Sequence, residues 1–130
     1  TKNVEEGLKS GINAFKGTSY TPDPKNGCVW AATGISSYYS PWAAEQYNSG
    51  VVYVPTLIEN AQAAGMYQRY GEGTLEPGDI IVYGDSHVVV STGGNGYAGN
   101  SSSRGMVVEG SDFTNMGGQY ATGIIKTSRQ

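Results

Sequence analysis

The chain is organised around the stretch Lys25-Asn26-Gly27-Cys28-Val29-Trp30-Ala31-Ala32-Thr33, which holds its only cysteine. Apolar residues continue at helical spacing as far as Tyr39, and Pro41 follows shortly after. This pattern predicts a helix that ends before the proline, with Asn26 as a suitable N-cap. Cys28 is therefore expected in the first turn, where unpaired backbone N–H groups and the helix dipole favour the thiolate over the thiol.

The only histidine, His87, opens the apolar run His87-Val88-Val89-Val90, which is typical of a strand. A cysteine at a helix start and a histidine at a strand start suggest a cysteine hydrolase, since they supply a nucleophile and a base. Each residue also has a purely structural interpretation. Cys28 can be a small buried hydrophobic residue, and His87 can be a surface histidine or a satisfied core histidine.

Length and composition favour one domain and exclude several partners. A chain of 130 residues is long enough to bury a real core. Its 20 glycines and 10 tyrosines indicate a loop-rich, largely β surface with many tight turns. The net charge of -3 gives no basic surface, so nucleic acid is not an expected partner. One cysteine excludes an internal disulfide, and one cysteine with one histidine is too little for a structural zinc site.

No membrane partner is expected either. No apolar run approaches the roughly 20 residues that are needed to cross a bilayer. Because the chain begins with Thr1 rather than methionine, we expect residues 1–130 to be a single catalytic domain that was excised from a longer protein.

Hydrophobic spacing changes from helical to strand-like along the chain. Helices are predicted over residues 2–15, from Cys28 towards Tyr39, over 41–49 and over 55–64. Strands are predicted over residues 80–83, 87–92, 97–100, 106–109 and 123–127. The glycine-rich residues 93–96 predict a hairpin connection with positive φ. Helices followed by strands indicate an α+β fold in which the N-terminal helices pack on an antiparallel sheet.

Asn100 is a candidate for a third group of the site. A Cys–His pair needs a residue that holds the imidazole in the correct tautomer. His87 and Asn100 lie on the two arms of the predicted hairpin, so strand pairing brings them near each other, with the register open by one residue. The alternative is that Asn100 is a turn residue before Ser101-Ser102-Ser103.

Further polar and aromatic residues have open interpretations. Asp85 lies two residues before His87, so strand alternation would place both on one face. There Asp85 would tune the histidine or bind a substrate amine, and the alternative is a solvated turn aspartate. Asp79, in the Pro-Gly-Asp turn, is interpreted as structural. Four aromatic residues either line a glycan groove or pack the helices together; they are Tyr38, Tyr39, Trp42 and Tyr47.

The order of these parts resembles the NlpC family of papain-like cell-wall cysteine peptidases. The shared elements are the cysteine at a helix start, the stretch Leu75-Glu76-Pro77-Gly78-Asp79-Ile80-Ile81 that leads to His87-Val88, and a glycine turn before a polar residue. The similarity runs from about Gly17 to Ser101. It implies a papain-like fold. By the same resemblance the nucleophile is Cys28, the base is His87 and the third polar residue is Asn100, and Tyr20 corresponds to a family tyrosine that assists the oxyanion site.

Two positions depart from this family. The family usually has Asp-Cys-Ser, whereas this chain has Gly27-Cys28-Val29, and the third residue is often histidine rather than Asn100. Cys28-Val29-Trp30 is similar to the related CHAP amidases, which often place an aromatic residue two positions after the cysteine. Trp30 is therefore a further candidate for substrate binding. The second resemblance implies a CHAP-like amidase or a cross-bridge endopeptidase as the alternative activity.

Membership of the NlpC family implies peptidoglycan stem peptides as substrate, typically at the bond between D-Glu and the diamino acid. It also implies an extracellular or cell-wall location, reached by secretion or as part of a phage or surface protein. Attack by the Cys28 thiolate, with the Cys28 N–H at the oxyanion and His87 protonating the leaving amine, requires no metal or organic cofactor. The helix start and His87 are both expected to lower the pKa of Cys28 below about 8.5.

Two other classes use the same parts. A non-catalytic cell-wall-binding module would use the tyrosine-rich surface of the same fold. An acyltransferase, such as a transglutaminase-like enzyme, would use the same Cys28 and His87 pair. Thiol reactivity separates the binding module from both enzymes, and product masses separate hydrolysis from transfer.

Overall fold

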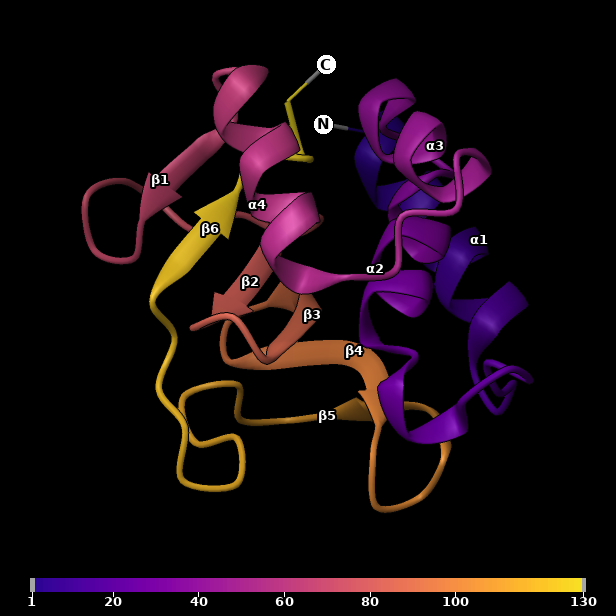
Figure 1. Cartoon of the computed structure of the whole chain (residues 1–130). Helices are drawn as coiled ribbons and strands as arrows, with labels where there is room; N and C mark the ends of the chain where they lie inside the picture. The colour runs from indigo at the N-terminus through magenta and orange to yellow at the C-terminus, as the bar shows by residue number, and fades with distance from the viewer. Residues whose placement is uncertain (1, 130) are drawn as a thin grey trace.

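The computed structural model describes residues 2–129 and has the expected α+β fold (Figure 1). Its helices are α1 (Lys2–Phe15), η1 (Pro24–Asn26, a 3-10 helix), α2 (Cys28–Ser36), α3 (Pro41–Asn48) and α4 (Val54–Ala63). Its strands are β1 (Tyr67–Arg69), β2 (Ile80–Tyr83), β3 (His87–Gly93), β4 (Gly96–Ser101), β5 (Met106–Gly110) and β6 (Gly123–Ile125). The helices come first and the longer strands afterwards, as the hydrophobic spacing predicts.

The strands form one antiparallel sheet in the order β1-β6-β2-β3-β4-β5. The predicted hairpin joins β3 to β4, and its turn contains Gly93 and Gly94 at φ of 110° and 56°. Only glycine adopts such angles without strain, so the glycine-rich sequence fixes this turn. Sequence spacing did not predict β1, because three residues show no period, and its pairing with β6 joins distant parts of the chain.

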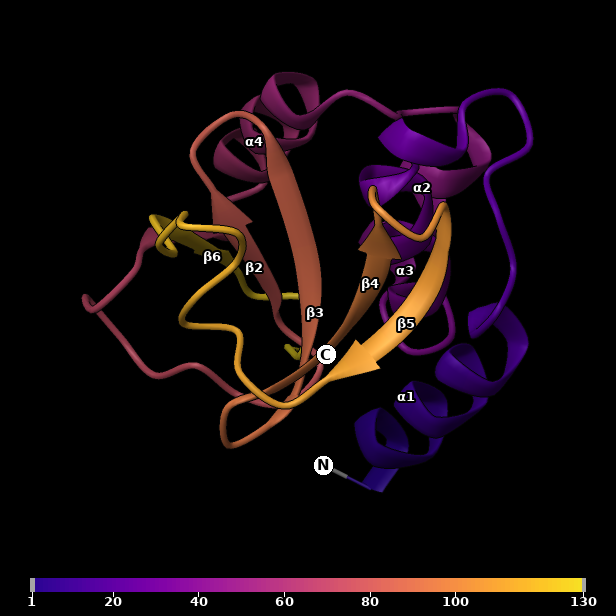
Figure 2. The same ribbon diagram turned by 90° about the horizontal axis from the view of Figure 1, so that it is seen from below.

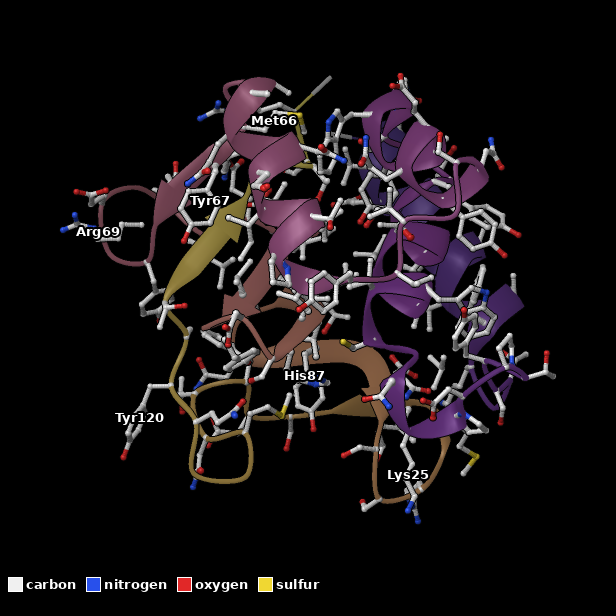
Figure 3. All side chains as sticks on the ribbon, viewed as in Figure 1. Lys25, Met66, Tyr67, Arg69, His87 and Tyr120 are labelled. Carbon is white, nitrogen blue, oxygen red and sulfur yellow. The ribbon has the colours of Figure 1, made fainter. Side chains whose placement is uncertain are left out.

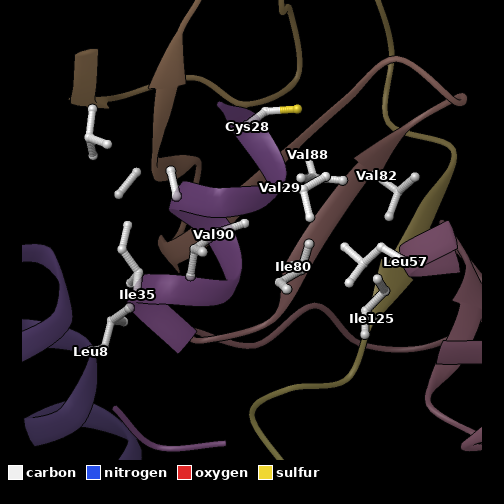
Figure 4. Packing of buried hydrophobic residues seen from close by; sticks show 14 of the residues in the cluster. Leu8, Cys28, Val29, Ile35, Leu57, Ile80, Val82, Val88, Val90 and Ile125 are labelled. Carbon is white, nitrogen blue, oxygen red and sulfur yellow. The ribbon is translucent and has the colours of Figure 1, made fainter. Parts of the chain in front are cut away.

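One sheet face is covered by helices, and the main core lies between them. Alternate residues of β2 and β3 point to this side, where they meet α2 and α4 (Figure 4). The contacts join Val82, Val88 and Val90 of the sheet with Ile35 of α2 and Leu57 of α4, all fully buried. Helices α1 and α3 pack against α2, so α2 is the central helix of this layer.

The opposite sheet face has a smaller core. Ile81, Tyr83 and Val89, the residues that alternate with the first set, pack there against Phe113. The Tyr83 hydroxyl donates a hydrogen bond to the Phe113 carbonyl at 2.5 Å. The connection between β5 and β6, rather than a helix, therefore supplies the cover of this face.

Strands β3 and β4 part towards one end of the sheet. Their pairing continues from the hairpin as far as Val90 and Ala98, and no further pair follows towards His87 and Ser101. Figure 2 shows the two strands diverging in this direction. Both strands also pack against α2, whose first residue is Cys28.

The start of α2 differs from the prediction. Its N-cap is Gly27, without a side-chain cap. Asn26 lies in η1 and donates its side-chain amide to Asp23 at 2.7 Å, so the predicted Asn26 cap is wrong. The prolines at 22 and 24 favour a tight turn before the helix, and this turn uses the asparagine locally.

The aromatic residues after α2 mainly pack helices. Tyr39 is buried and donates its hydroxyl to the Gly78 carbonyl at 2.7 Å. Tyr47 meets the edge of Phe15 with ring centroids 5.9 Å apart. Tyr38 is about half exposed. Among the described residues, none of the helices has the length and apolar character to span a bilayer.

Candidate active site

A groove of about 560 Å³ lies at the end of the sheet where β3 and β4 part. Its walls come from η1, the start of α2, both diverging strands, β5 and the loop before β6. The lining residues are Lys25, Asn26, Cys28, Ser86, His87, Tyr97, Gly99, Asn100, Ser101, Ser102, Ser103, Val108, Met116, Gly117 and Gln119. Cys28, His87 and Asn100 are all among them, so the fold brings the three sequence-predicted catalytic residues to one groove.

Cys28 is the first residue of α2 and is 8% exposed. It belongs to the edge of the helix-side core that meets the groove, and its side chain points away from the helix near Val88 (Figure 4). Backbone N–H groups of Val88, Val29 and Cys28 itself interact with the sulfur and favour the thiolate. The predicted position at a helix start is therefore confirmed.

The predicted effect on the thiol is wrong. Burial raises the pKa of Cys28 above its ordinary value, and this effect is larger than the opposite effect of the three backbone N–H groups. Reasoning from the helix dipole alone counts the N–H groups but omits the loss of solvation around the sulfur. In the free protein at neutral pH, Cys28 is therefore a protonated thiol.

His87 begins β3 and is partly buried at the groove (Figure 3). Its ring lies against Tyr83, its partner in β2, with centroids 5.8 Å apart. Burial lowers the pKa of His87 below its ordinary value. The imidazole is consequently neutral at neutral pH, the form that accepts a proton.

Among the described residues 2–129, no hydrogen bond joins Cys28 to His87. The reason lies in the strand period: Val88 faces the helices, so its neighbour His87 points to the other sheet face, where Tyr83 lies. The two side chains reach the groove from different sides of the sheet, at the point where β3 and β4 part.

Asn100 is nearly fully buried and lies on the helix side of β4, together with its β5 partner Val107. Its Nδ2 donates to the Pro24 carbonyl at 2.8 Å. Its Oδ1 is buried and accepts no hydrogen bond from any described residue. The predicted bond from the imidazole to this oxygen is therefore not formed. Continuing the β3–β4 register places Asn100 opposite Val88, one residue from His87, and that one step changes the face.

The other three predicted site residues do not line the groove. Tyr20 and Trp30 pack on each other with ring centroids 5.6 Å apart, beside Phe15. Asp85 is exposed in the turn between β2 and β3. Strand alternation does not apply within a turn, so the predicted shared face of Asp85 and His87 has no basis in the structure.

Sequence reasoning missed several groove residues. Lys25 contributes a cation from η1 (Figure 3). Ser86 precedes His87 and accepts a hydrogen bond from the Gln119 side chain at 3.0 Å, which ties the loop before β6 to this wall. Proximity in sequence to Cys28 and His87 was a usable signal for Lys25 and Ser86. Nothing local marked Gln119, because the fold alone brings it there.

The described part of the chain holds no cluster of three or more His, Cys, Asp or Glu side chains that would bind a metal ion. No protein-family model matches the chain, no curated protein is significantly similar to it, and no solved structure is significantly similar to its fold.

Proposed function

We propose that the protein is a cysteine amide hydrolase that cleaves an amide bond in peptidoglycan stem peptides. The observation that carries the proposal is that the only thiol and the only imidazole of the chain line one groove. Cys28 comes from a helix start and reaches the groove from the helix side of the sheet. His87 comes from a strand start and reaches it from the other face. A papain-like fold and the resemblance to NlpC peptidases are parts of this proposal.

Burial favours the neutral forms of both groups, so the proposed mechanism begins with a proton transfer between them. Because the thiol is protonated and the imidazole neutral, His87 takes the proton from Cys28 while the sulfur attacks the amide carbonyl. The C–N bond then breaks, and the imidazolium gives its proton to the leaving amine. Water, deprotonated by His87, adds to the thioester and releases the acid and the thiol.

These chemical steps require the His87 imidazole to turn towards the Cys28 sulfur when a substrate fills the groove. Catalytic hydrogen bonds are often long or missing in a free enzyme and form in the substrate complex. The backbone N–H groups of Cys28, Val29 and Val88 lie beside the sulfur and are candidate donors for the oxyanion.

The charge of the groove supports a substrate that carries carboxylates. Lys25 is the one Lys or Arg among the described lining residues, and none of them is Asp or Glu. The whole chain is nevertheless acidic, with a net charge of -3. Stem peptides of peptidoglycan carry free carboxylates, and the Ser101–Ser103 hydroxyls can hydrogen-bond to a peptide backbone. A stem peptide also implies an extracellular or cell-wall location.

The experiment is digestion of purified peptidoglycan, with the released fragments identified by mass. We expect wild-type protein to release fragments cut at one type of amide bond, and Cys28→Ala to release none while it remains folded. The exposed Asn48 of α3 gives a control: Asn48→Ala should release fragments at the wild-type rate. Fragment masses also distinguish a stem-peptide cut from the CHAP-like amidase and cross-bridge alternatives, and from acyl transfer.

A wall-binding module is the second candidate, and two observations favour it: Cys28 and His87 are not bonded, and the thiol is buried. Such a module would sediment with peptidoglycan equally well as wild type and as Cys28→Ala, and would release no fragments. That outcome would replace the hydrolase proposal.

A further inference from the structure

The amide of Asn100 is built into the segment that leads to the cysteine. It lies 2% exposed beneath η1, where its Nδ2 donates to the Pro24 carbonyl at 2.8 Å. A carbonyl accepts hydrogen bonds and does not donate them, so only the nitrogen of the amide can face Pro24. This contact fixes the orientation of the Asn100 side chain.

The same side chain lies against the start of α2. A Cβ added to Gly27 would lie 2.6 Å from the Cβ of Tyr20 and 3.5 Å from the Cγ of Asn100. Gly27 is thus enclosed between these two side chains, directly before Cys28. Because α2 has no side-chain cap, packing around Gly27 and the Asn100 bond to η1 define where the helix begins.

Asn100 has no corresponding link to the histidine. It shares the helix side of the sheet with Val107, whereas His87 shares the other side with Tyr83. Its free atom, Oδ1, accepts no hydrogen bond from the described residues, so no imidazole N–H reaches it.

We infer that Asn100 is a positioning residue for the nucleophile: it holds η1, and through Gly27 it sets the position of Cys28 at the groove. This role differs from orienting the imidazole, which the resemblance to NlpC peptidases assigns to the third polar residue. The importance of this role for catalysis rests on the proposed hydrolase function, whereas the positioning of the thiol can be measured without any substrate.

The test uses the single thiol and the single imidazole of the chain, because each gives one unambiguous signal. The rate of iodoacetamide alkylation against pH reports Cys28, and NMR of the imidazole C–H against pH reports His87. Asn100→Ala removes the bond to Pro24 and should let the start of α2 loosen. The thiol then becomes more exposed, so its titration should shift down and its alkylation at pH 7 should accelerate by at least about threefold. The His87 midpoint should stay within about 0.2 pH unit of wild type.

A second variant reaches the same segment from the other side. Gly27→Ala leaves the Asn100 amide in place but brings a methyl group against Tyr20, so it should also change the alkylation rate and leave the His87 midpoint unchanged. Asn48→Ala, at an exposed position in α3, should change neither signal. Thermal unfolding of each variant establishes that the folded protein is being measured. Asn100→Leu, which also removes the donor to Pro24 but fills the buried site, carries the test if Asn100→Ala does not fold.

The inference is overturned if replacing Asn100 shifts the His87 midpoint, or if it leaves the alkylation rate of Cys28 unchanged. These results are independent of peptidoglycan cleavage. A protein that cleaves nothing but shows the expected alkylation change would lose the proposed function and keep the positioning role. A protein that cleaves peptidoglycan but shows no alkylation change would keep the function and lose the role.

Discussion

Two polar clusters lie at opposite ends of the β2–β3 strand pair, and their hydrogen bonding is very different. Asp79 lies directly before β2 and is paired with Lys126, which follows β6. Cys28 and His87 lie near the other end, where β2 finishes and β3 begins. Both clusters are largely buried, so the comparison is between polar groups in similar surroundings.

The Asp79 cluster is fully paired. Lys126 Nζ donates to Asp79 at 2.5 Å, to Glu76 at 3.0 Å and to the Thr74 carbonyl at 2.9 Å, which uses all three of its donors. Asp79 also accepts from the backbone N–H groups of Glu76 and Ser128. The cluster joins the Pro-Gly-Asp turn to the end of the chain, as the structural interpretation of Asp79 predicts.

The groove cluster is incompletely paired. Cys28 and His87 are not bonded to each other, and Asn100 Oδ1 has no donor within residues 2–129. Burial shifts both titrating groups towards their neutral forms. The polar groups are thus fully hydrogen-bonded in the Asp79 cluster but not in the groove cluster. Buried polar groups without hydrogen-bond partners are typical of functional sites.

The largest effect that sharpens this contrast is expected from His87→Ala. If the groove cluster is catalytic, loss of the base should lower kcat for peptidoglycan cleavage by about 10²–10⁴. Thermal stability should change little, because the imidazole makes no hydrogen bond to another described residue. Asp85→Ala is a matched control two residues away, exposed and outside the groove, and it should retain wild-type turnover. Equal turnover of all three proteins would remove His87 from the mechanism.

The opposite cluster should respond in stability. Lys126→Met leaves the buried Asp79 carboxylate without its cation, and breaking a buried pair in this way costs about 3–5 kcal/mol of unfolding free energy. Urea denaturation, with the slope compared between variants, measures this loss.

Lys16 provides the matched control, because its 2.8 Å pair with Glu109 is exposed. Lys16→Met should cost about 0–1 kcal/mol. If the two lysine variants lost similar stability, the buried Asp79–Lys126 pair would contribute no more to stability than the exposed Lys16–Glu109 pair does.

The sequence predicted the fold well where the signal was local. Helical spacing located α1, α3 and α4 within two residues, and the glycine-rich turn located the β3–β4 hairpin. Prediction failed where distant residues decide. Strand β1 exists through its pairing with β6, and Asn26 is used by η1 rather than by α2.

The site was predictable only in part, for a similar reason. Residue type and local pattern identified Cys28 and His87, and the structure places both in the groove. The face of Asn100 depends on register, and one residue of difference moves it from the histidine to the helix start. The pKa of Cys28 depends on its burial in the folded protein, which no pattern around the cysteine contains.

The smallest effect concerns the pH dependence of stability, which tests the buried thiol directly. An unfolded cysteine loses its proton near pH 8.5. Because burial raises the pKa of Cys28, the folded protein keeps this proton at higher pH than the unfolded chain does. Stability should therefore be unaffected by Cys28 below about pH 8.5 and should fall as pH rises above it, by at most about 1.4 kcal/mol per pH unit.

The useful pH range of this measurement ends near pH 10. Above it Tyr39 and Tyr83 also begin to change the unfolding free energy, because burial raises the pKa of both hydroxyls. Urea denaturation at intervals between pH 7.5 and roughly pH 10 should show the decline in wild type, and Cys28→Ala should lack it. His87 does not interfere, because its lowered pKa acts only below about pH 6.5. If wild type and Cys28→Ala had the same pH profile of unfolding free energy, the Cys28 thiol would be solvated. The groove cluster would then not be a buried polar cluster like that of Asp79.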